Sequence, residues 1–165
     1  MRTIIHDLNE KEANKIRFNK DDKILTALNC RKNCIGCFSC WIKHPKKCIL
    51  KDEFSCITDY LKNSDELIII SKCRYGCYSA STKKVLERCI GYVLPYFTIR
   101  NSEIHHESRY DKKIKLSTYF YGDISEEDKL NIENLVKANS VNLNASCCNI
   151  NYINNIEEIN ECIHL

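Results

Sequence analysis

The chain has 165 residues, 44% of them hydrophobic and 28% charged, which is the composition of one globular domain over residues 1–165. Its formal net charge of +3 comes from 25 basic residues scattered among 22 acidic ones, so we expect no nucleic-acid partner. No run reaches the roughly 18 apolar residues of a membrane span, and Met1–Asp7 shows no apolar export signal, so we expect a cytoplasmic protein without membrane contact.

The first half of the chain alternates predicted strands and helices. Short strands are expected at Thr3–His6 and Lys23–Leu28, with a polar helix of about two turns at Asn9–Arg17 between them. After a cysteine-rich loop, Asp52–Lys62 has the apolar period of a helix. Glu66–Ser71 contains four consecutive apolar residues, which is typical of a parallel strand buried on both faces.

The second half continues this alternation. A serine-capped helix is predicted to end near Ile90, and Gly91–Tyr110 has no clear period and is predicted to be a long loop. A strand at Lys115–Tyr121 and a helix that begins at Ser125 follow, and the last strand is Ser146–Ile153. Strands that alternate with helices predict right-handed crossovers and a five-stranded parallel sheet covered on both faces. A ligand is then expected at the carboxyl ends of the strands, near residues 7–9, 30–37, 71–78 and 122–125.

The cysteines are unevenly distributed. Five of the twelve lie within 19 residues: Cys30, Cys34, Cys37, Cys40 and Cys48. The spacing Cys34-x2-Cys37-x2-Cys40-x7-Cys48 suits a [4Fe–4S] cluster, because two-residue gaps turn three thiolates toward one centre and a fourth closes the site. Structural zinc sites use two separated pairs of ligands, so zinc fits this spacing less well. A loop of reduced thiols without metal is the alternative of equal weight, and a disulfide is not expected in the cytoplasm.

Segment 33–52, which holds these cysteines together with Trp41 and Pro45, resembles the cysteine loop of the flavodoxin-like NAD(P)H-dependent FMN reductases, including the iron–sulfur flavoproteins. Glu66–Ser71 and the loop and helix after it resemble the next block of that family. The resemblance implies a flavodoxin-like, three-layer, doubly wound five-stranded parallel sheet with strand order 2-1-3-4-5. It also implies an oxidoreductase that uses NAD(P)H and FMN, with a cluster in its iron–sulfur members. The metal ligands would be Cys34, Cys37, Cys40 and Cys48.

The resemblance also assigns residues to the FMN site and to partners. The positions that match the two loops around the flavin ring are Ser71, Lys72, Cys73, Arg74, Tyr75 and Gly76 in the first and Tyr121, Gly122 and Asp123 in the second. The electron acceptor would be a small molecule or a protein, and family members are commonly homodimers or homotetramers. The candidate interface is an apolar patch of Tyr92, Pro95, Tyr96 and Phe97.

The phosphate-binding loop of the family is degenerate in this chain. In the family, glycines and hydroxyl residues after the first strand let backbone N–H groups surround the FMN phosphate. Here residues 7–12 read Asp-Leu-Asn-Glu-Lys-Glu, with three carboxylates and no glycine, serine or threonine. FMN binding and its absence therefore stand as even alternatives. The competing functions are a non-flavin thiol or metal redox-sensing protein and an oligomerisation module that keeps the fold without a cofactor. No catalytic acid or base is assigned.

Overall fold

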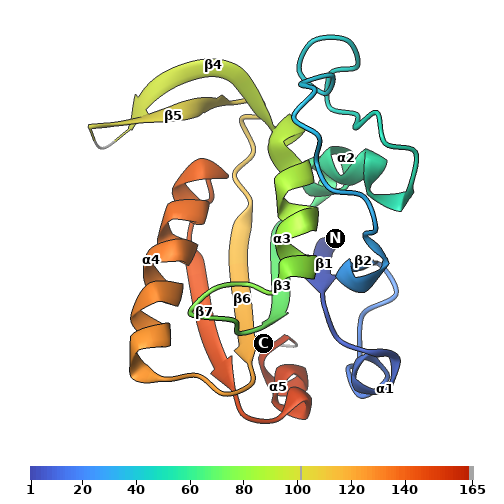
Figure 1. Cartoon of the computed structure of the whole chain (residues 1–165), viewed down its shortest axis with the longest axis vertical. Helices are drawn as coiled ribbons and strands as arrows, with labels where there is room; N and C mark the ends of the chain where they lie inside the picture. Colours follow the sequence, from blue (N-terminus) through green and yellow to red (C-terminus); the bar gives the residue numbers. More distant parts are fainter. Residues whose placement is uncertain (101, 164–165) are drawn as a thin grey trace.

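The computed structural model describes residues 1–100 and 102–163, and its centre is a five-stranded parallel sheet. The strand order is β2-β1-β3-β6-β7, and each neighbouring pair is parallel. The predicted order 2-1-3-4-5 and the flavodoxin-like fold class are confirmed (Figure 1). The strands are β1 (Arg2–His6), β2 (Lys23–Thr26), β3 (Glu66–Lys72), β6 (Lys115–Tyr121) and β7 (Cys148–Ile153).

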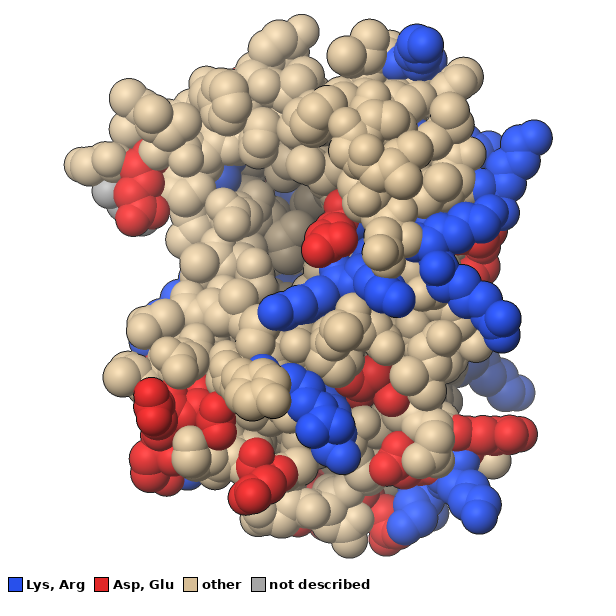
Figure 2. Space-filling view, in the orientation of Figure 1, with Lys and Arg blue, Asp and Glu red and all other residues tan. Residues whose placement is uncertain are grey.

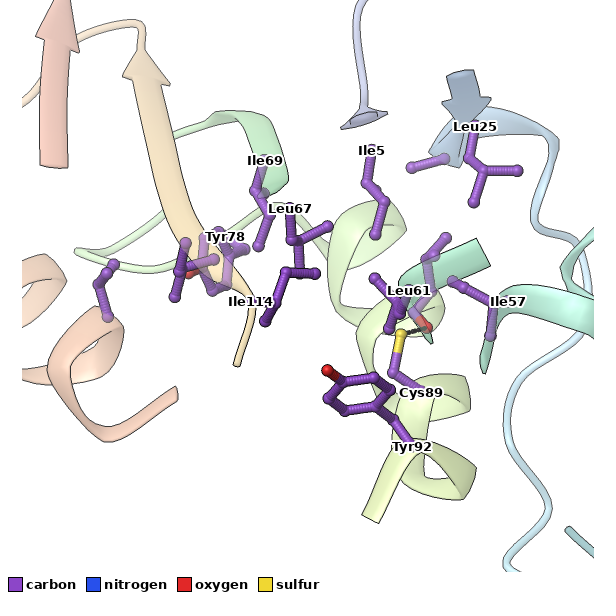
Figure 3. Packing of buried hydrophobic residues seen from close by; sticks show 14 of the residues in the cluster. Ile5, Leu25, Ile57, Leu61, Leu67, Ile69, Tyr78, Cys89, Tyr92 and Ile114 are labelled. Atoms are coloured by element: carbon purple, nitrogen blue, oxygen red, sulfur yellow. Dashed lines mark hydrogen bonds between the residues drawn. The ribbon is translucent and has the colours of Figure 1, made fainter. Parts of the chain in front are cut away.

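Three helices cover one face of this sheet: α2 (Ile57–Asn63), α3 (Ala80–Glu87) and α4 (Glu126–Asn142). Ser79 caps α3 and Ser125 caps α4, as the sequence predicts. The apolar residues of these helices pack on alternate residues of the strands, because side chains along a strand point to opposite faces. Figure 3 shows Ile5, Leu67 and Ile69 of the sheet in this core.

The opposite face is covered more thinly, by α1 (Glu10–Ala13) and α5 (Ile159–Ile163). Its core contains Ile4, Ile68 and Ile70 from the strands, with Ile159 and Ile163 from α5. The expected helix Asn9–Arg17 is reduced to the single turn of α1. None of the four residues of α1 is buried; Leu8 and Ile16, on either side of it, hold the segment against the sheet outside the helix.

The predicted long loop Gly91–Tyr110 is wrong. It contains a two-stranded antiparallel hairpin of β4 (Val93–Arg100) and β5 (Glu103–Ser108). The hairpin lies across the amino-terminal edge of the sheet, beside the last turn of α4 (Figure 1). It is fixed there because Arg100 donates a hydrogen bond to the carbonyl of Val141, at 3.0 Å.

Short 3-10 turns complete the chain at Ala27–Asn29, Glu53–Cys56, Arg88–Tyr92 and Ile156–Glu158. Within the described residues, no helix has both the length and the apolar character needed to cross a membrane.

Candidate functional site

The carboxyl-terminal edge of the sheet is closed by Asp7. This residue follows β1, is 7% exposed, and turns its carboxylate toward the ends of β3 and β6. The carboxylate accepts hydrogen bonds from the Tyr121 hydroxyl at 3.0 Å, the Ser71 hydroxyl at 3.1 Å and the Lys72 backbone N–H at 3.0 Å. Burial and the charge of Asp7 raise the pKa of Tyr121. The place where doubly wound folds bind ligands is therefore occupied by a side chain of the protein itself.

The segment after Asp7 does not provide a phosphate site. The Asn9 side chain accepts the Glu12 backbone N–H at 3.0 Å, and the Glu12 side chain accepts the Asn9 backbone N–H at 2.9 Å. These N–H groups are therefore already hydrogen-bonded within the cap of α1. The first turn of α1 also carries the carboxylates of Glu10 and Glu12. An anion at this position would meet the carboxylates of Glu10 and Glu12 together with that of Asp7, so the phosphate of FMN does not fit here.

The nine predicted FMN residues lie together at this edge, but their loops are packed closed. The Cys73 N–H donates to the Tyr121 carbonyl at 2.8 Å, and Arg74 and Cys77 bond to each other through their backbones. Gly76 has a φ of +65° and lies against α4, where an added Cβ would be 2.6 Å from Cβ of Asn131. Tyr75, at the tip, is 97% exposed. The arrangement does not fit FMN in the mode that the resemblance implies.

The four predicted metal ligands are brought together elsewhere. Cys34, Cys37, Cys40 and Cys48 all line one pocket of about 80 Å³, here called the four-cysteine pocket. Most of the remaining wall is apolar and is formed by Ile35, Phe38, Ile49, Leu50 and Ile90, with Gly36 and Arg88 completing it. Burial raises the pKa of the Cys40 thiol, and the neighbouring Cys48, Cys34 and Cys37 add to this effect. The thiols therefore share one small pocket in which Cys34, Cys40 and Cys48 are half-buried and Cys37 is exposed.

These thiols do not converge tightly enough to hold one ion. Among the residues that the structure describes, no three His, Cys, Asp or Glu side chains form a group suited to a single metal. A tetrahedral zinc with Zn–S bonds of about 2.3 Å needs its sulfurs roughly 4 Å apart. A four-iron cube is itself several ångströms wide and holds its thiolates at its corners, farther apart than zinc does. Among the described residues the structure therefore shows neither a preformed zinc site nor a preformed cluster site.

Arg88 forms one wall of the four-cysteine pocket. Its side chain is fully buried and donates to both carboxylate oxygens of Asp52 at 2.6 Å, and its Nη1 lies 3.8 Å from Sγ of Cys30. Burial alone would lower the pKa of Arg88, but the bonds to Asp52 and the nearby Cys48 raise it above its usual value. Its Nε has no hydrogen-bond partner in the described part of the chain. The Arg88–Asp52 ion pair thus stands beside the pocket, with one buried donor of the guanidinium unpaired.

The four-cysteine pocket and the predicted FMN loops lie at opposite edges of the sheet. Because α3 returns antiparallel to the strands, Arg88 at its carboxyl end lies at the amino-terminal edge (Figure 1). Trp41, next to Cys40, donates its indole N–H to the carbonyls of Ile90 and Val93, each at 3.0 Å. The cysteines were expected at the carboxyl end of the second strand; instead, the segment after β2 runs back along α3. The seven residues of β3 span the sheet from one edge to the other, so the two edges are roughly 20 Å apart.

Two residues were not recognised as site residues from the sequence: Arg88 at the four-cysteine pocket and Asp7 at the opposite edge of the sheet. Arg88 and its partner Asp52 lie 36 positions apart, so no local spacing could indicate the pair. Asp7 was counted only as a charge that opposes phosphate. Its position directly after a buried strand was the available signal that it closes the edge.

No model of a known protein family matches this chain, and no curated protein does. Two solved structures resemble it over nearly its whole length. One is an FMN-dependent NADH-azoreductase from Bacillus anthracis in complex with FMN: it is 10% identical, 97% of this chain and 92% of that chain are covered, and the TM-score is 0.54. The other is azoreductase AzrA: it is 13% identical, 99% and 91% are covered, and the TM-score is 0.53. Both show the fold that this chain shares.

Proposed function

We propose that this chain is a redox protein of the flavodoxin-like fold that transfers electrons through a [4Fe–4S] cluster. The observation that carries the proposal is that Cys34, Cys37, Cys40 and Cys48 all line one small pocket. When bound, such a cluster supplies one-electron transfer at a potential set by charge, hydrogen bonds and solvent exposure. The four thiolates would ligate it, at the surface of the protein, since Cys37 is exposed.

Arg88 supports this assignment. A cluster with four thiolates carries net negative charge, and it would lie beside the Arg88–Asp52 ion pair, whose own charges already balance. Nε of Arg88 has no partner among the described residues, and hydrogen bonds to cluster sulfurs are one of the factors that tune reduction potential. Asp52 holds the guanidinium in place through two bonds of 2.6 Å.

An NAD(P)H-dependent FMN oxidoreductase is the second candidate. The likeness to two azoreductases, one of them FMN-dependent and in complex with FMN, favours it. The closed edge at Asp7 opposes FMN binding in that mode, so no chemical step is derived through the flavin here. In either case a small molecule or a protein would accept the electrons, with NADH or NADPH as the donor in the flavin case.

We also propose that the chain forms a homodimer or homotetramer through the hairpin. Of the four patch residues expected from the sequence, Tyr92 is buried and Pro95 half-buried, whereas Tyr96 and Phe97 are exposed. Ile99 and Ile104 extend the patch and are 75% and 73% exposed. The hairpin has only two strands in the described residues, so each strand has an outer edge at which no further strand is paired.

Anaerobic purification followed by quantification of iron, acid-labile sulfide and FMN tests the proposal. We expect about four iron and four sulfide per chain and a broad absorbance that dithionite bleaches. Iron with stoichiometric FMN would favour the oxidoreductase that carries both cofactors. FMN without iron would leave only the flavin candidate. A protein that contains neither iron nor FMN would overturn both candidates and leave a thiol sensor or an oligomerisation module.

A further inference from the structure

The cysteine segment, residues 31–51, has an excess of positive charge that the small net charge of the whole chain hides. It contains no aspartate or glutamate and six basic residues: Arg31, Lys32, Lys43, Lys46, Lys47 and Lys51. The rest of the chain has 19 basic and 22 acidic residues, so its net charge is −3. Figure 2 shows basic side chains along the upper right of the molecule, where Figure 1 draws this segment in blue to cyan, and acidic ones mainly in the lower half.

These positive charges are not neutralised by carboxylates of the chain. Lys46 is half-buried, with its ammonium 6.0 Å from the centre of the Tyr110 ring, and the other five basic residues are exposed. None of the six forms an ion pair with a carboxylate in the described part of the chain. Exposed charges attract a partner of opposite sign over roughly 10 Å at 0.1 M salt. The segment therefore fits a partner with negative charge.

The same segment exposes apolar side chains between its charges. Four large ones are exposed to solvent: Ile35 (66%), Phe38 (47%), Ile42 (76%) and Ile49 (49%). Three of them, all except Ile42, also line the four-cysteine pocket. The Ile42 N–H donates to the Phe38 carbonyl at 3.2 Å, which places Ile42 one turn after Phe38. An apolar centre with a charged rim is the arrangement of a protein–protein interface.

Short turns hold the charges close to the four-cysteine pocket. The Lys43 N–H donates to the Ser39 carbonyl at 3.1 Å, and the Lys46 N–H donates to the Cys40 carbonyl at 2.8 Å. The other basic residues stand next to Lys46 or at the two ends of the segment: Lys47, Arg31, Lys32 and Lys51. A partner that is held by these side chains therefore lies against the pocket.

We infer that the cysteine segment docks an electron-carrier protein whose contact surface is acidic. That the partner carries electrons rests on the proposed function, whereas the positive rim and the apolar centre do not depend on it. A nucleic acid would also meet the positive rim, but its interfaces are more polar than those between proteins, so it covers the apolar centre less well. Neither a nucleic acid nor a lipid surface has a redox group to exchange electrons with the pocket.

Two small haem proteins of opposite charge test this surface: the acidic cytochrome b5 and the basic cytochrome c, both one-electron carriers. Their binding to the full chain, purified anaerobically, is measured by isothermal titration calorimetry. We expect saturable binding of cytochrome b5 and none of cytochrome c. The affinity for cytochrome b5 should fall about 10-fold between about 20 and about 200 mM NaCl, because salt screens exposed charges.

Paired charge reversals localise the binding. The double substitution Lys43→Glu with Lys47→Glu reverses two charges of the rim and should weaken the binding of cytochrome b5 by about 10-fold or more. The control Lys11→Glu with Lys20→Glu changes the net charge equally at exposed positions outside the segment and should weaken binding by no more than about 2-fold. Unfolding curves verify that each variant folds.

An apolar pair of variants tests the centre of the surface. Ile42→Ser should weaken the binding of cytochrome b5 by about 3-fold or more, because less apolar area is buried in the complex. Leu130→Ser makes a similar change at an exposed leucine of α4 and should leave the affinity unchanged.

Iron analysis of the same samples separates this inference from the proposed function. A chain without iron that binds cytochrome b5 through Lys43 and Lys47 would keep the docking surface and lose the cluster. No binding of cytochrome b5, equal binding of both cytochromes, or equal losses in the two double variants would overturn the inference whatever the iron content. Tighter binding to a DNA duplex or to phosphatidylserine vesicles than to cytochrome b5 would overturn it as well.

Discussion

Arg88 and Asp52 form a bidentate ion pair in which two guanidinium nitrogens lie 2.6 Å from the two carboxylate oxygens. The Arg88 side chain is fully buried, and Nη2 of the same guanidinium also donates to the Leu50 carbonyl at 3.4 Å. Asp52 further accepts the Phe54 N–H and so begins the helical segment before α2. One pair thus joins the end of the cysteine segment to the end of α3, and the geometry of the four-cysteine pocket depends on it.

Asp52→Asn should lower the free energy of unfolding by about 3 kcal/mol, because it leaves the buried Arg88 charge without its partner. Urea denaturation followed by circular dichroism measures the change. Asp21→Asn is the matched control, since Asp21 is exposed, and it should stay within about 0.5 kcal/mol of the wild type. An equal effect of both substitutions would show that the pair adds nothing to stability.

The buried His6 should make stability depend on pH. Burial lowers its pKa, and its Nε2 lies 3.3 Å from the Thr26 hydroxyl. Well above pH 6.5 the His6 ring is neutral in both the folded and the unfolded chain. Below about pH 6.5, the ordinary pKa of histidine, the unfolded chain binds a proton that the buried ring of the folded chain does not yet accept. Stability should therefore fall as the pH decreases from 7.5 to 5.5. Urea midpoints at these two pH values should converge in His6→Phe but not in His44→Phe, and equal convergence in both would exclude His6 as the cause.

Cys40→Ser should lower the iron content from about four per chain to less than one, because a hydroxyl replaces one of four thiolates. Iron and sulfide analysis after anaerobic reconstitution measures this. Cys147→Ser alters an exposed cysteine outside the pocket, and Cys30→Ser alters a buried one that does not line it, so both should keep their iron. A Cys40→Ser protein with full iron would place the metal elsewhere.

Ile99→Lys should weaken self-association of the chain at least 10-fold. Ile99 is 75% exposed and pairs with Ile104, so a charge on this apolar face opposes its burial against a second copy. Sedimentation velocity over a concentration series measures the effect. Leu130→Lys adds the same charge at an exposed leucine of α4 and should leave association unchanged. A wild-type chain that stays monomeric at all concentrations would contradict the proposed interface.

The sheet was predictable because its signal is local. Four apolar residues in Glu66–Ser71 require burial on both faces, and capping serines mark where α3 and α4 begin. The hairpin was missed because its apolar residues, such as Phe97 and Ile99, are exposed and interleaved with polar ones, so no core pattern distinguishes them from a loop. Its position is set by long-range contacts with α4, which the local sequence does not encode.

The candidate site was predictable in its composition but not in its place. The spacing of Cys34, Cys37, Cys40 and Cys48 predicted metal ligands; the four residues line one pocket, and their role as ligands stays a prediction. The path of the cysteine segment is set by hydrogen bonds from Trp41 to the carbonyls of Ile90 and Val93 and from Arg88 to Asp52. Both contacts join residues that are tens of positions apart. Such contacts follow from the packed fold and have no local pattern.

Asp7→Ala should lower the free energy of unfolding by about 2–4 kcal/mol, because it leaves three buried or half-buried donors, from Ser71, Lys72 and Tyr121, without their acceptor. Asp7→Asn keeps one acceptor oxygen and should cost about 1 kcal/mol. Urea denaturation of both variants measures the difference, with Glu10→Ala on the exposed turn of α1 as the control. If Asp7→Ala were as stable as the wild type, the three donors would not need this carboxylate.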